Sequence, residues 1–147
     1  MGLFDSLLGG QSAQQGLSKQ EAFLSVMLIS VAADGNVSED EIGEIAVRSK
    51  RMQSLKQMSN DQLGSTIRKL VNQAKSEGAD ALLKKAVEAL PADLRPSAFA
   101  IGVDLMLGDG SVQGNEMKAL EVLQQRLEVP NDLAMKIVEV FQIKSKG

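Results

Sequence analysis

Signals for the beginning and the end of helices recur about every 15 to 20 residues along this chain. No stretch alternates apolar and polar residues in the manner of a half-buried β-strand. The sequence therefore predicts an all-α fold, a compact bundle of about seven helices. We expect helices to begin near Ser18, Ser38, Asn60, Ala79 and Pro96, a sixth to carry Met117 to Leu127, and a seventh to follow Pro130.

Two of these starts have the spacing of a capping box, in which a serine precedes a glutamate by three residues: Ser18 with Glu21, and Ser38 with Glu41. The helix that follows Ser18 is apolar on nearly every face. Such a helix is expected at the centre of the bundle, because no side of it suits contact with water.

The chain has 147 residues, which one hydrophobic core can organise. We expect one helical domain over residues 18–147, preceded at 1–17 by a short amphipathic segment and a linker rich in Gly, Ser and Gln. Five methionines fall at apolar positions and are expected in the core, with a place in an adaptable partner groove as the alternative: Met52, Met58, Met106, Met117 and Met135.

Arg48 and Asp104 are expected to have structural roles, with a ligand role for Asp104 as the alternative. Arg48 opens a basic cluster that suits the solvated end of a helix. Asp104 stands in an otherwise apolar helix and is expected to face solvent or to be capped.

The absence of Cys and His excludes thiol nucleophiles, Ser-His-Asp catalysis, structural zinc sites and iron–sulfur clusters. Ligand chemistry is left to oxygen atoms, which suit hard cations such as Ca²⁺ and Mg²⁺. The net charge of −3 and the lack of Trp and Tyr argue against nucleic acid as a partner. We expect a protein that is not an enzyme, with no catalytic residue and no organic cofactor.

One motif occurs twice. Overlaying Asp34-Gly35 on Asp109-Gly110, an offset of 75 residues, aligns Asp-Gly-x-Val-x-x-x-Glu, which ends at Glu41 and at Glu116. The helices that follow correspond at an offset of 70 residues. The sequence thus predicts two three-helix units with a pseudo-twofold relation and one helix between them. Apolar pairs in the alignment include Ile42 with Met117, Leu63 with Leu133, and Leu70 with Val140.

The motif has two interpretations, and the sequence leaves both open. In the first, Gly supplies a turn after one helix and Glu caps the next. In the second, Asp34, Glu41, Asp109 and Glu116 bind a cation, because the motif matches the last eight positions of an EF-hand loop. The first part of that loop is missing, so the four carboxylates would have to meet across the pseudo-twofold axis, where a weakly bound Ca²⁺ or Mg²⁺ would relieve their repulsion.

These residues carry a family resemblance. Ala32-Ala33-Asp34-Gly35 before an acidic helix start, and Gly108-Asp109-Gly110 with Glu116, resemble the tellurite-resistance TerB family and the related N-terminal domain of DjlA-type co-chaperones. The likeness covers about residues 18–140. It implies a helical bundle with an internal repeat and an acidic surface that binds cations. The second copy departs from the acid-rich pattern, because Gly114 and Asn115 replace the two acids of the first copy, and that half of a site is expected to be weaker.

The resemblance implies a stress-response module of the tellurite-resistance type that acts with protein partners in a membrane-associated assembly. The alternatives are a protein-interaction scaffold without metal, and a hydrolase that uses paired carboxylates such as Asp34 with Asp109. No signal peptide is visible, and the longest apolar stretch, residues 22–33, is shorter than a spanning helix. We expect a cytoplasmic protein without a transmembrane segment, with a peripheral membrane location as the alternative.

Overall fold

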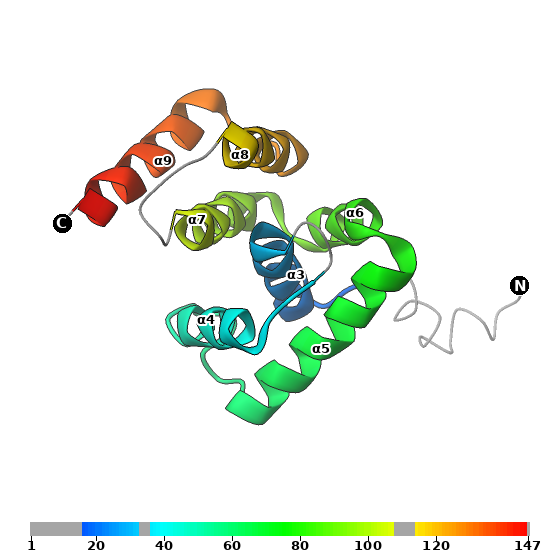
Figure 1. The fold of residues 1–147 in the computed structure, drawn as a ribbon. Coiled ribbons are helices and arrows are strands. Elements are labelled where there is room, and N and C mark those ends of the chain that lie inside the picture. The colour runs from blue at the N-terminus through cyan, green and yellow to red at the C-terminus, as the bar shows by residue number, and fades with distance from the viewer. Residues whose placement is uncertain (1–15, 33–35, 108–113, 147) are drawn as a thin grey trace, which may run out of the picture.

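The computed structural model describes residues 16–32, 36–107 and 114–146, with side chains of the last range from Met117 onward. Every regular element in these ranges is helical, which confirms the predicted all-α bundle of about seven helices (Figure 1). The α-helices are α3 (Lys19–Val31), α4 (Glu39–Ser49), α5 (Asn60–Glu77), α6 (Ala79–Ala89), α7 (Arg95–Met106), α8 (Gly114–Arg126) and α9 (Asn131–Lys146), and η1 (Ala92–Leu94) is a 3₁₀ turn.

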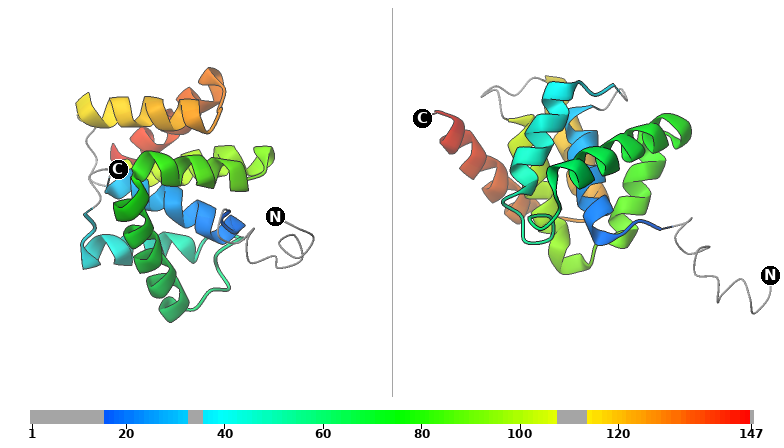
Figure 2. Two further views of the ribbon diagram at one scale, coloured as in Figure 1. Left: turned by 90° about the vertical axis from the view of Figure 1, so that its right-hand side faces the viewer. Right: turned by 90° about the horizontal axis from the view of Figure 1, so that it is seen from below.

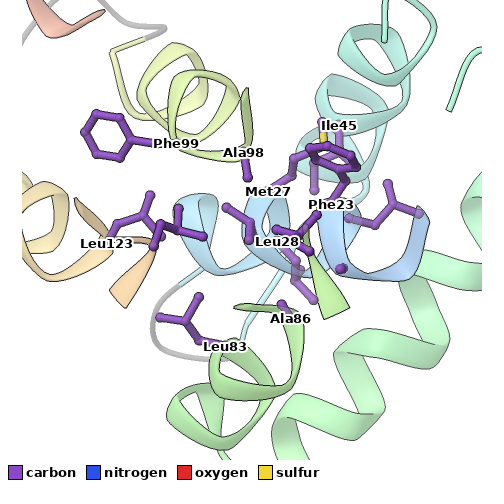
Figure 3. Packing of buried hydrophobic residues seen from close by; sticks show 14 of the residues in the cluster. Phe23, Met27, Leu28, Ile45, Leu83, Ala86, Ala98, Phe99 and Leu123 are labelled. Atoms are coloured by element: carbon purple, nitrogen blue, oxygen red, sulfur yellow. The ribbon is translucent and has the colours of Figure 1, made fainter. Parts of the chain in front are cut away.

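Helix α3 is the central helix, as its sequence predicts. It packs against α4, α5, α6 and α7, and most extensively against the last two. Figure 3 shows Ile45 of α4, Ala86 of α6 and Ala98 of α7 approaching α3 from different sides. Phe23 and Met27 of α3 are fully buried among them. An all-round apolar surface is stable only in such a position, because each face of the helix removes its side chains from water.

The remaining helices form layers around α3 and α7. Helices α4 and α5 lie on one side of α3, and α7 lies on the other, with α8 and α9 beyond α7 (Figures 1 and 2). Helix α6 packs against α3 and α5 and also touches α8. Helices α8 and α9 are therefore the outer layer of the bundle on the α7 side.

The predicted capping boxes are present and explain where the first two helices begin. The Ser18 amide donates to Glu21 Oε1 at 2.9 Å, and the Glu21 amide donates to Ser18 Oγ at 3.0 Å. Each pair of bonds satisfies backbone groups that have no partner inside the helix. Helix α5 has a third box, Ser59 with Gln62, which begins one residue before the predicted start at Asn60.

Glycine separates α5 from α6 and allows α3, α7 and α8 to approach one another. Gly78 has a φ of 98° between α5 and α6, a conformation that other residues rarely adopt. At Gly102 of α7 an added Cβ would lie 2.7 Å from Ser30 Oγ and 2.8 Å from Leu123 Cδ2. The space at Gly102 is therefore filled by side chains of α3 and α8.

Two expectations about side chains are wrong. Met117 and Met135 are exposed, because none of the other described helices packs over the outer layer of the bundle. Arg48 is no solvated helix end: its Nε donates to Asp104 Oδ2 at 3.1 Å, and both side chains are about four-fifths buried. This ion pair joins α4 to α7, and it also shows that Asp104 does not simply face solvent.

The helix order agrees with two three-helix units, α3 to α5 and α7 to α9, with α6 between them. The acidic turns at the centre of the repeat, residues 34–35 and 109–110, lie outside the described residues. The pseudo-twofold relation of the units therefore stays a prediction. The amphipathic segment and most of the linker, within residues 1–15, also lie outside them.

Candidate functional site

The predicted metal ligands are only partly within the described residues. Asp34 and Asp109 lie outside them, as does the side chain of Glu116. Glu41 is described, and its Oε1 accepts a hydrogen bond from the Ser38 amide at 2.9 Å, while its own amide donates to Ser38 Oγ at 3.1 Å. Glu41 therefore has the capping role of the first interpretation. Whether it also meets the other three carboxylates stays a prediction, and the described side chains hold no other group of three acids placed to bind a metal ion.

A second feature, which was not predicted from the sequence, is an apolar groove between α8 and α9. It encloses about 490 Å³, and its base is Phe99 of α7. Leu120 and Ala134 are buried at its sides, and Met117 and Met135 are exposed at its opening. We call this feature the α8–α9 groove. It is lined by Phe99, Met117, Leu120, Glu121, Gln124, Asn131, Ala134, Met135, Val138, Glu139 and Gln142.

The groove exists because α8 and α9 each pack on α7 and make little contact with each other. The four residues between them, 127–130, turn the chain back on itself. Gln124 holds this end together, since its Nε2 donates to Val129 O at 2.9 Å and to Asn131 Oδ1 at 2.6 Å. In the first half of the chain, by contrast, α4 packs directly against α5.

Residues that align between the two halves of the chain differ in their exposure to solvent. Ile42 and Leu63 are 9% and 0% exposed, whereas the residues aligned with them, Met117 and Leu133, are 48% and 37% exposed. Leu70 is fully buried, and the aligned Val140 is 59% exposed. Positions that the first half covers with its own helices are thus open to solvent in the second half.

Acidic groups accompany the apolar lining of the α8–α9 groove. Glu121 comes from α8 and Glu139 from α9, so the two carboxylates lie on opposite walls. Neither forms an ion pair with any described residue, and the lysines of these helices do not line the groove. The groove therefore combines an apolar base with a negative rim.

A smaller cavity of about 180 Å³ lies beside the Arg48–Asp104 pair, lined also by Leu107, Phe141 and Lys144. Its charged groups are of both signs, and the carboxylate of Asp104 is already bonded to Arg48. This arrangement links three helices and offers no pair of carboxylates for acid–base chemistry. The paired acids of the hydrolase alternative, Asp34 and Asp109, are outside the described residues.

No protein-family model matches the chain, and neither does any curated protein or any solved structure. The resemblance to the TerB family consequently remains a prediction from the duplicated motif. Among the helices described, none is both long enough and apolar enough to cross a membrane.

Proposed function

We propose that this protein is a non-enzymatic interaction domain that binds an amphipathic helix of a partner protein in the α8–α9 groove. The observation that carries the proposal is the groove itself, an apolar channel between two helices over which none of the described helices packs. Helix-in-groove binding is a common mode of protein recognition, and a volume of about 490 Å³ falls within the range of ordinary ligand sites.

Exposed apolar side chains are concentrated on the two helices that form the groove, and two of them, Met117 and Met135, line it. Seven large apolar residues are exposed in the described part of the chain, and six of them belong to α8 or α9: Met117, Val122, Leu133, Met135, Val140 and Ile143. Scattered exposed residues need no explanation, but a concentration on one layer marks an interaction site. The methionines at the groove opening suit such a role, because their unbranched side chains adapt to a partner surface.

The family resemblance suggests the kind of assembly in which this binding would occur. A TerB-like module would use the groove to join a stress-response assembly of the tellurite-resistance type. Weak binding of Ca²⁺ or Mg²⁺ by Asp34, Glu41, Asp109 and Glu116 is a separate proposal, supported by the duplicated motif alone. Binding by the groove does not depend on it.

A defined peptide tests the groove. We expect a synthetic helical peptide of about 18 residues, with Leu at i, i+3, i+4 and i+7 and Gln beside this face, to bind the wild-type domain in fluorescence anisotropy. Met117→Gln with Met135→Gln keeps side-chain length and helix propensity but removes apolar contact at the opening. At about 1 kcal/mol for each partly buried methionine, binding should weaken roughly 30-fold.

Val47→Gln is the matched control, because Val47 is an exposed apolar residue of α4 that does not line the groove. It should leave the affinity for the peptide unchanged. No binding by the wild-type domain, or an equal loss in the Val47 variant, would refute the groove as the binding surface.

A further inference from the structure

We infer, as a deepening of the proposed function on which it rests, that the partner helix is basic. Its apolar face would fill the α8–α9 groove, and Lys or Arg residues beside that face would pair with Glu121 on one wall and Glu139 on the other. The inference rests on two related features of the molecule, the charge of the groove and the charges at the aligned positions of the first half of the chain.

The first feature is the unpaired acidic rim. Glu121 and Glu139 line the groove from opposite walls, and no described cation pairs with either of them. An acidic partner helix would bring like charges together at both walls. A basic one would meet complementary charge at both, and complementary charge raises the rate of association and excludes wrong partners.

The second feature is the arrangement at the aligned positions of the first half. There α5 supplies the cations: Arg68 Nη2 donates to Glu39 Oε1 of α4 at 3.0 Å, and Lys69 Nζ donates to Glu21 Oε2 of α3 at 2.6 Å. These two bonds join α5 to α4 and α3 at the surface of the bundle.

In the second half, the residues aligned with Arg68 and Lys69 are Val138 and Glu139, both of which line the groove. One cation is replaced by an apolar residue and the other by an acid. The wall of α9 therefore carries an acid, Glu139, where its counterpart α5 carries a cation, and this acid can pair with a cation from outside the chain. This is the charge that a basic amphipathic helix supplies.

The test uses two peptides that share the apolar face described above and differ only in the residues beside it, which are Lys in one and Glu in the other. At low ionic strength the wild-type domain should bind the Lys peptide roughly three- to tenfold more tightly than the Glu peptide, as expected for two rim ion pairs. In 1 M NaCl, where the Debye length is about 3 Å, most of this preference should disappear.

Charge-reversal variants test whether Glu121 and Glu139 cause the preference for the Lys peptide. Glu121→Lys with Glu139→Lys should reverse the preference, so that the Glu peptide binds more tightly. Glu88→Lys with Asp93→Lys changes the net charge equally at exposed acids that do not line the groove, and it should leave most of the preference intact.

The outcomes separate this inference from the proposed function. Equal affinity of the wild-type domain for the Lys, Glu and Gln peptides would refute the basic partner and leave the groove in place. A preference that the control variant alters as much as the groove variant would also refute it, because the effect would then be one of net charge. Failure of all three peptides to bind would refute the proposed function itself.

Discussion

Gly102 of α7 lies in close contact with α3 and with α8 of the outer layer, and replacing it with alanine tests how tightly these three helices pack. The added Cβ would lie 2.7 Å from Ser30 Oγ of α3 and 2.8 Å from Leu123 Cδ2 of α8. Carbon atoms in ordinary contact are about 3.5 to 4.0 Å apart, so both neighbours have to move. Overpacking of this kind costs about 1 to 3 kcal/mol, and the higher helix propensity of alanine returns about 1 kcal/mol.

The free energy of unfolding should therefore fall by about 1 kcal/mol in Gly102→Ala, and the melting temperature by about 3 °C. Gly43 of α4 is the matched control, since an added Cβ there meets no atom within 4 Å. Gly43→Ala should raise the stability by about 1 kcal/mol through helix propensity alone. Urea unfolding of both variants and the wild-type protein measures the difference.

A second substitution shows whether the strain has the stated cause. Ser30→Ala removes the Oγ atom nearest to the new methyl group and should partly restore the stability of the Gly102→Ala protein. On its own it loses one hydrogen bond, from Ser30 Oγ to Val26 O at 2.7 Å, and should cost little. If Gly102→Ala stabilises the protein as much as Gly43→Ala, the close packing of α7 between α3 and α8 is refuted.

Three further predictions concern other parts of the chain. Burial is the largest single influence on the pKa of Glu21 and raises it, but the hydrogen bond and charge of Lys69 and the bonds of Ser18 together lower that pKa below its ordinary value. The stability advantage of the wild-type protein over Glu21→Gln should therefore be complete above the unfolded-state pKa of about 4.3 and be lost as the pH falls through the lower folded-state pKa. A stability difference that stays constant in urea unfolding from pH 7 to pH 3 would contradict this. Deleting residues 1–15 should change neither the melting temperature nor the affinity for the Gln peptide, and a rise in affinity would show that this segment competes for the groove. Ca²⁺ or Mg²⁺ at ten times its dissociation constant should raise the melting temperature by about 3 to 6 °C, and Asp34→Asn with Asp109→Asn should abolish the rise; an unchanged wild-type melting curve at millimolar concentrations would end the metal proposal.

The helices could be predicted from the sequence because their ends are local. A capping box such as Ser38 with Glu41 needs only four consecutive residues, and both of its bonds form within one turn. The same reasoning placed α3 at the centre, since its apolar residues leave no face for solvent. Signals of this kind do not depend on how the helices are arranged.

The α8–α9 groove and the Arg48–Asp104 pair could not be predicted in this way. An apolar position such as Met135 shows that a helix has an apolar face, but whether another helix covers that face is decided by the whole arrangement. Helix α9 did carry one hint: Leu133, Met135 and Val140 are too widely spread around the helix for one contact with α7 to bury them all. Arg48 and Asp104 are 56 residues apart, and only the packing of α4 on α7 brings them together.

The central claim is that a helix binds between α8 and α9, and the methionine methyl groups of the protein report on it directly. In a ¹³C-methyl methionine NMR titration with the Lys peptide, the resonances of Met117 and Met135 should shift, because both side chains line the groove. The resonances of Met27, buried in α3, and of Met58, which lies between α4 and α5 and does not line the groove, should stay in place. Shifts at Met27 or Met58 with none at Met117 and Met135 would contradict the account.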